Sequence, residues 1–154
     1  MCKTCWTLVL VLSIAVAGMA YKFIIAGDAI LSSDGRQAIQ LSDSERNLVL
    51  TEMRTFLSSA QAITLALTTE DMGQVAKAAR IVGAAAQQAV PGSLIGKLPL
   101  EFKKLGFDTH QKFDQLALDA EQLGDREYTM KQLAELMNNC VACHATYRFE
   151  PGEI

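Results

Sequence analysis

Residues 42–68, SDSERNLVLTEMRTFLSSAQAITLALT, carry the clearest helical pattern in this chain of 154 residues. Ser42 and Glu45 have the spacing of a capping box, in which each side chain bonds the other residue's backbone N–H at a helix start. Behind this cap, apolar residues recur at the spacing of one helix face: Val49, Met53, Phe56, Ala60, Ile63 and Leu67. The stretch therefore predicts an amphipathic helix that ends at about Thr68.

Three further stretches show the same periodicity. The second ends at Pro91, and the third runs from Pro99 to Gly124. The fourth begins with Asp125 as its cap and ends at Pro151. Their apolar stripes are Met72, Val75, Ala79, Val82, Ala86 and Val90; then Phe102, Leu105, Thr109, Phe113, Leu116, Ala120 and Leu123; then Met130, Leu133, Met137, Cys140, Val141 and His144.

Composition agrees with an all-α fold. Half of the residues are hydrophobic and only 6% are aromatic, which favours helix over sheet. Four amphipathic helices with mostly short connections predict an antiparallel up-down-up-down four-helix bundle over residues 42–154. Residues 28–41 precede it as a linker with a turn at 32–35, and no strand pattern is apparent.

The first 27 residues form a separate hydrophobic helix that has two interpretations. As a cleaved signal peptide, the segment would end after small residues such as Gly18 and Ala20. As an uncleaved anchor, Trp6–Gly27 reaches the roughly 20 residues that a membrane span needs, and Lys22 would extend to the headgroups. The anchor is slightly favoured, because the apolar run resumes after Lys22.

The charges around this helix predict its orientation. Lys3 precedes it and Asp28 and Asp34 follow it, so we expect the N-terminus inside and the main domain outside, in the periplasm. Cys2 and Cys5 lie near the start without other potential ligands and are interpreted as incidental thiols. The net charge is −3 with no basic stripe, so a nucleic-acid partner is not expected.

Near the C-terminus, Cys140-Val-Ala-Cys143-His144 has the pattern C-x-x-C-H. Two thiols three residues apart lie on one helix face, where they can add to the two vinyl groups of one haem. His144 follows on the same segment and can bind the iron. The sequence therefore predicts one covalent haem c. A zinc site is a less well supported interpretation, because His110 is the only further Cys or His beyond residue 27. A thioredoxin-like redox pair would need alternating strands and helices, which the sequence does not show.

The sixth iron ligand separates the functional alternatives. A filled position gives an electron carrier, and an open one binds a small gas molecule such as NO or CO. Met53 lies roughly 13 Å into the first helix and His110 at a similar depth in the third, so both are expected at the level of His144. Each residue has an ordinary alternative, since a Met in a helix stripe usually fills a core and a His at a stripe edge usually lies near the surface.

The motif with the Ala-Thr-Tyr147-Arg148 that follows it resembles the class II c-type cytochromes, which are cytochrome c-prime and its low-spin relatives with a His/Met haem. The resemblance covers about residues 42–148. It implies a four-helix bundle with haem near one end, Cys140 and Cys143 as thioether links, and His144 as the proximal ligand. It leaves open a homodimer through the first two helices.

The first helix resembles two branches of this superfamily. The spacing of Arg46 and Leu50 resembles five-coordinate cytochromes c-prime, in which such a Leu faces the distal side of the iron. Residues 52–55, Glu-Met-Arg-Thr, resemble the related periplasmic b-type cytochrome, where a first-helix Met pairs with a last-helix His. His110 with the Phe-Asp pair that follows it resembles a non-ligating His of that protein. The resemblance thus favours Met53 as the sixth ligand over His110.

The expected function is electron transfer with redox partner proteins, and the alternative is a five-coordinate gas-binding protein. Arg54 and Arg148 are candidates for pairing with haem propionates. Beyond the haem, no cluster of acid, base and nucleophile is readable, so an enzyme is not expected. A haem-bearing accessory subunit or sensor domain of a larger complex stays open.

Overall fold

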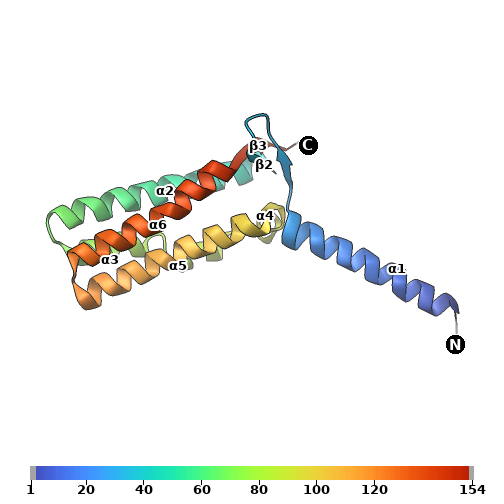
Figure 1. Cartoon of the computed structure of the whole chain (residues 1–154), viewed down its shortest axis with the longest axis horizontal. Helices are drawn as coiled ribbons and strands as arrows, with labels where there is room; N and C mark the ends of the chain where they lie inside the picture. The colour runs from blue at the N-terminus through green and yellow to red at the C-terminus, as the bar shows by residue number, and fades with distance from the viewer. Residues whose placement is uncertain (1–2, 153–154) are drawn as a thin grey trace.

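The computed structural model describes residues 3–152 and is mostly helical, with a small sheet at one end (Figure 1). Its elements in chain order are α1 (Lys3–Ala20), the π-helix η1 (Tyr21–Ala26), β1 (Ala29–Leu31), β2 (Gln37–Leu41), α2 (Asp43–Thr68), α3 (Met72–Arg80), the 3₁₀-helix η2 (Ala84–Ala89), α4 (Gly92–Lys97), α5 (Leu100–Leu123), α6 (Arg126–Thr146) and β3 (Tyr147–Pro151). The all-α prediction is broadly confirmed, with the sheet as an addition.

The predicted start of α2 is confirmed in detail. The Ser42 side chain accepts a hydrogen bond from the Glu45 backbone N–H, and the Glu45 carboxylate accepts one from the Ser42 N–H at 2.9 Å. The same carboxylate pairs with the Lys97 ammonium at 2.7 Å, which joins the end of α4 to the start of α2. The contacts of the Glu45 carboxylate with Lys97 and with Ser42 lower the pKa of Glu45, and Lys97 is the largest cause.

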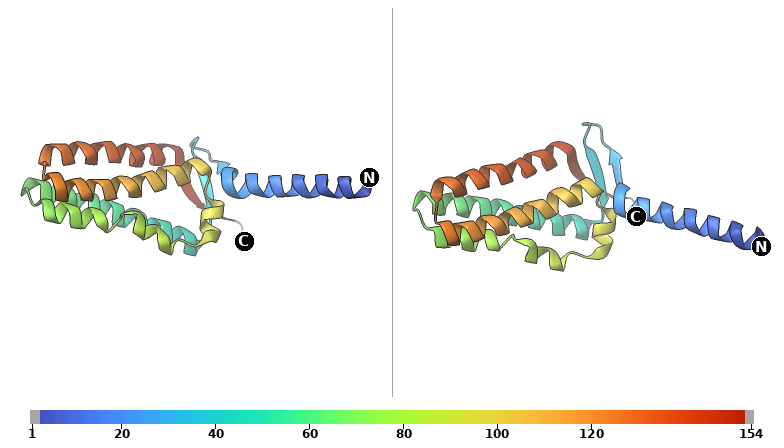
Figure 2. Two further views of the ribbon diagram at one scale, coloured as in Figure 1. Left: turned by 90° about the horizontal axis from the view of Figure 1, so that it is seen from below. Right: turned by 60° about the horizontal axis from the view of Figure 1, so that its bottom comes forward.

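The long helices α2, α3, α5 and α6 lie side by side (Figures 1 and 2). The chain runs away from the sheet in α2, returns through α3, η2 and α4, leaves again in α5 and comes back in α6. Far from the sheet, apolar residues of all four helices form one core, which includes Ile63, Leu67, Val75, Ala79, Phe113, Leu116, Leu133 and Leu136. A second cluster lies at the sheet end: Ile39, Leu41, Val49, Leu94, Leu98, Phe102 and Tyr147.

The interpretation of residues 28–41 as a linker was wrong. They form the antiparallel hairpin β1–β2, and β2 also pairs in parallel with β3. Ala38, Ile39 and Leu41 are completely buried. The strand was missed because its parallel partner follows more than 100 residues later, so no local window contains the pairing. For the same reason the fourth helix ends at Thr146, not at Pro151.

The second predicted helix is also divided. α3 ends at Arg80, and the chain turns before the short helix η2. Gly83 has an extended backbone, and the Asp114 carboxylate accepts a hydrogen bond of 2.9 Å from the Ala84 N–H. A Cβ at Gly83 would overlap the Asp114 carboxylate. The helix therefore breaks where a distant carboxylate from α5 caps a new start.

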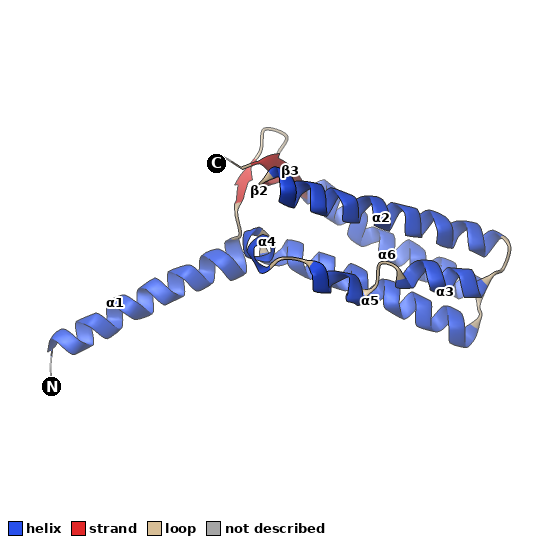
Figure 3. Cartoon of the chain, turned by 180° about the vertical axis from the view of Figure 1, so that it is seen from behind, coloured by secondary structure: helices blue, strands red, loops and turns tan. Residues whose placement is uncertain are grey.

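Before the sheet, α1 and η1 form one continuous helix that projects away from the other helices (Figure 3). By length and composition, Lys3–Ala26 is able to span a membrane, and none of it is buried. Its end is held by Lys103, whose ammonium donates to the carbonyls of Phe23 and Ile24 at 2.9 and 3.1 Å. Cys5 is exposed on this helix, whereas Cys2 lies outside the described residues.

Candidate functional site

The C-x-x-C-H motif occupies the last two turns of α6, directly before β3. Cys140 and Cys143 are half-buried free thiols, and His144 is exposed. Burial raises the pKa of Cys140, and burial with the neighbouring Cys140 raises the pKa of Cys143 to about 11. Both shifts disfavour the thiolate form that a metal ligand needs.

The face of α6 that packs inward differs from the predicted one. Its fully buried residues are Thr129, Leu133, Leu136 and Asn139. Asn139 is held on this face, because its amide donates to Asp108 at 2.7 Å and to Thr109 at 3.1 Å on α5. Three apolar members of the predicted stripe are exposed by 42%, 47% and 68%: Met130, Met137 and Val141. The prediction that α6 presents His144 to the core was therefore wrong in this packing.

This exposed stripe surrounds the motif. Met137, Cys140, Val141 and His144 follow the spacing i, i+3, i+4 and i+7 and so share one face of α6. Met137 and Val141 are thus exposed apolar side chains on the same face as Cys140 and His144. A flat apolar ligand would cover such a surface.

Two residues that sequence reasoning missed hold the end of α6. Arg36, in the β1–β2 turn, donates to the carbonyls of His144 and Tyr147 at 3.3 and 3.4 Å. Asp34 orients Arg36 through contacts of 2.7 and 2.9 Å, and these hydrogen bonds, with one from Ser32, lower the pKa of Asp34. An Asp-Gly-Arg turn gives no local sign that it caps a helix more than 100 residues away.

The two arginines predicted as propionate partners have other contacts. Arg148 pairs with Asp34 and with Glu150, both at 3.3 Å. Arg54 donates to the Thr51 hydroxyl at 2.8 Å. Arg148 thus belongs to the charge network that ties β3 to the hairpin.

Met53 is placed at the level of the motif. Its half-buried side chain and that of Cys143 both pack against the cluster at the sheet end. Leu50 lies one turn earlier on α2 and is also half-buried. The structure therefore brings the start of α2 and the end of α6 to one end of the molecule.

His110 is placed elsewhere and is buried. Its Nδ1 lies 2.7 Å from the Val82 carbonyl oxygen, and its Nε2 lies 3.3 Å from the Glu52 carboxylate. The Phe56 ring packs against the imidazole at a centroid distance of 4.8 Å. Burial alone would lower the pKa of His110, but the hydrogen bonds to Glu52 and Val82 outweigh it, so that the pKa is raised. Both ring nitrogens already have partners.

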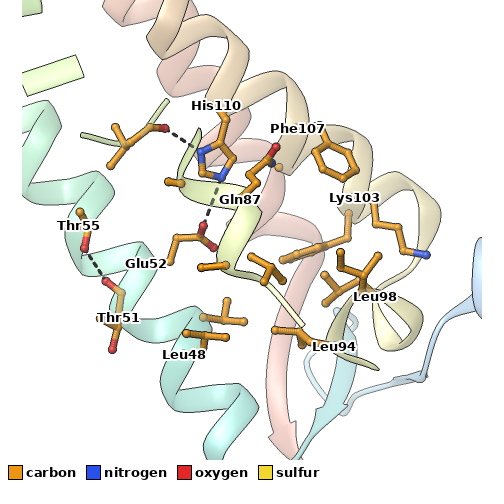
Figure 4. Close-up of a pocket in the computed structure, with 18 of the residues that line it drawn as sticks. Leu48, Thr51, Glu52, Thr55, Gln87, Leu94, Leu98, Lys103, Phe107 and His110 are labelled. Carbon is orange, nitrogen blue, oxygen red and sulfur yellow. Dashed lines mark hydrogen bonds and ion pairs between the residues drawn. The ribbon is translucent and has the colours of Figure 1, made fainter. Parts of the chain in front are cut away.

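The pair Glu52–His110 borders a cavity of about 280 Å³ between α2, η2, α4 and α5 (Figure 4). None of the residues that line it comes from α6. On α2 the lining positions are Leu48, Val49, Thr51, Glu52 and Thr55. Leu50 and Leu57 lie on the opposite side of the same helix, because each residue advances the direction by about 100°. No wall of the cavity comes from α6, but the cavity and the motif both border the cluster at the sheet end: Val49 and Phe102 line the cavity, and Cys143 packs against the same cluster.

No family model, curated protein or solved structure matches the chain. Among residues 3–152, no three His, Cys, Asp or Glu side chains converge as a ligand set for a metal ion. A haem needs less from the protein, because the porphyrin supplies four nitrogens and the chain only the axial positions. Two thiols one helical turn apart, an adjacent imidazole and an apolar face around them fit that requirement.

Proposed function

We propose that the chain is a c-type cytochrome of the cytochrome c-prime superfamily, built as an antiparallel up-down-up-down four-helix bundle, and that it transfers electrons on the periplasmic side of the membrane. The observation that carries this proposal is the end of α6, where the free thiol of Cys140, the exposed imidazole of His144 and exposed apolar side chains share one face, and the free thiol of Cys143 lies one helical turn from Cys140. Cys140 and Cys143 hold the haem vinyl groups and His144 binds the iron.

Each group at this site has a separate task. A bound haem supplies one-electron chemistry at its iron. The two thioethers fix the ring against α6, and Met137 and Val141 shield its face from water. Burial by apolar groups and a methionine ligand both favour the reduced iron, so a raised potential is expected. Arg36 holds the end of α6, and with it His144, in place through its hydrogen bonds to the His144 and Tyr147 carbonyls.

Met53 is the proposed sixth ligand, because it packs against the same cluster as Cys143. The second candidate function is gas binding with five-coordinate iron, and it is supported by Leu50, which lies one turn before Met53 on α2 and is half-buried like it. In the full chain, M53A removes the sulfur-to-iron charge-transfer band of the ferric protein if Met53 binds. If Leu50 faces an open position, that band is absent from the wild type and carbon monoxide binds rapidly to the reduced protein.

The proposed location follows from the N-terminal helix. If Lys3–Ala26 is retained, it anchors the bundle on the outer face of the inner membrane; if it is cleaved, the bundle is soluble in the periplasm. The anchored form has structural support, because Lys103 binds the end of this helix and the Asp28 N–H donates to the Lys97 carbonyl. N-terminal sequencing of the mature protein separates the two forms.

The attachment test uses thiol variants in a host that exports and loads c-type cytochromes. C140A/C143A should lose all haem that survives denaturing electrophoresis, and C5A is the matched control because Cys5 is an exposed thiol far from α6. Haem that stays covalently bound in C140A/C143A, or a wild type that never acquires haem, contradicts the proposal.

A further inference from the structure

The cavity bordered by the Glu52–His110 pair has no part in the proposed haem attachment. It measures about 280 Å³, just below the range of about 300–1,000 Å³ that is usual for sites of small organic ligands. Its walls are mostly apolar, and its polar groups gather at the Glu52–His110 pair. An apolar cavity with a few converging polar groups is the usual form of a small-molecule site.

We propose that this cavity binds the ring of a lipid-soluble quinol, with the Glu52 carboxylate accepting a hydrogen bond from a quinol hydroxyl. The ligand's route from the membrane rests on the anchored form of the proposed function, whereas the site itself does not depend on haem.

The polar end of the cavity selects a neutral hydroxyl donor. Glu52 already pairs with His110 at 3.3 Å, and a carboxylate has acceptor sites for further hydrogen bonds. Its charge disfavours a ligand with a carboxylate or phosphate of its own. Desolvation inside an apolar cavity strengthens a hydroxyl-to-carboxylate bond.

The walls and the rim select a flat apolar body. Phe102 and Phe107 line the cavity from α5 and offer ring surfaces for stacking or edge contacts. Three large apolar lining residues are exposed by 42%, 44% and 59%: Leu48, Phe107 and Ile81. Such a rim in solvent is a surface over which an apolar tail would lie.

One end of the cavity lies beside the membrane helix. Lys103 lines the cavity, and its ammonium binds the carbonyls of Phe23 and Ile24 at the end of that helix. The Lys103 ammonium is thereby hydrogen-bonded to the membrane helix, and Figure 4 shows the Lys103 side chain directed away from Glu52. His110 follows Lys103 by seven residues, which is about 10 Å along α5. A ligand from the membrane would thus place its tail toward the anchor and its ring near Glu52.

Gly106 allows the cavity to be filled without disturbing the fold. It lines the cavity from α5, and a Cβ placed on it meets no atom within 4 Å. G106L therefore puts a side chain into the cavity and also replaces a residue of low helix propensity. Gly92 at the start of α4 is a matched control, because a Cβ there also meets no atom within 4 Å and Gly92 does not line the cavity.

The experiment measures the affinity of the full chain, in detergent micelles, for a ubiquinol analogue with a ten-carbon tail. The method is equilibrium dialysis, with the quinol kept reduced under argon. Wild type and G92L should bind the quinol with equal affinity, and G106L should bind it at least tenfold more weakly. E52Q should bind the quinol about tenfold more weakly, because a neutral amide oxygen accepts a weaker hydrogen bond than a carboxylate. It should not weaken binding of the oxidised quinone, which has no hydroxyl to donate. Unsaturable binding to wild type, equal affinities of wild type and G106L, or an equal loss of quinol and quinone binding in E52Q overturns the proposal. Dialysis reads the probe directly, so a missing haem would not affect this outcome.

Discussion

The motif on α6 and the cavity beside Glu52 differ in how they are built. The motif on α6 is five consecutive residues, and its chemistry is set by their order along one helix. The cavity takes its walls from α2, η2, α4 and α5, and its polar pair joins residues 58 positions apart in the chain, Glu52 and His110. A motif within one helix can be recognised from sequence alone, whereas a cavity between helices depends on where the helices break and turn.

The largest expected effect separates the two regions directly. C140A/C143A should abolish covalent haem, while G106L should load haem as the wild type does, because Gly106 lies in the cavity and not on α6. Absorbance of the alkaline pyridine haemochrome measures both. Loss of haem in G106L to the same extent would mean that cavity and motif form one site.

The next effect concerns Met53, the proposed sixth ligand. M53A should change the ferric spectrum by loss of the sulfur-to-iron band and lower the potential, because a thioether ligand stabilises the reduced iron. Leu57→Ala is the control, since Leu57 is exposed on the same helix. An identical spectrum in wild type and M53A would remove Met53 from the iron.

A third change tests why the second predicted helix breaks. G83A should destabilise the protein by about 1–3 kcal/mol, because its Cβ overlaps the Asp114 carboxylate that caps η2. Urea unfolding followed by circular dichroism measures this. Gly73→Ala is the comparison, since its Cβ would meet only the Asp71 carboxylate at an ordinary 3.4 Å. Equal stability of G83A and wild type would show that η2 does not need this contact.

These cases show what the sequence predicts and what it leaves out. The capping box of α2 and the apolar stripe behind it were predicted because both are local. The pairing of β2 with β3 and the cap of α6 by Arg36 were not, because their partners lie more than 100 residues apart. On α6 the buried residues Thr129, Leu136 and Asn139 each lie one position before a residue of the predicted stripe, and Asn139 is bonded there to α5, a contact that no local pattern reveals.

A smaller effect concerns the pH dependence of the cavity side. Because the folded-state pKa of His110 is raised, its charged form stabilises the fold below the unfolded pKa of about 6.5. This contribution is lost as the pH rises through the folded pKa. The unfolding free energy of wild type relative to H110Q should therefore be largest near pH 6 and fall toward pH 9. A difference that grows with pH would contradict the assignment of the Glu52–His110 pair.

The most direct test of the central claim is the intact mass and peptide map of the exported wild-type chain. The mature protein should carry the mass of one haem, and the peptide containing residues 140–144 should hold it through both cysteines. An exported chain in which this peptide is unmodified, or in which Cys140 and Cys143 are joined in a disulfide, would contradict this claim.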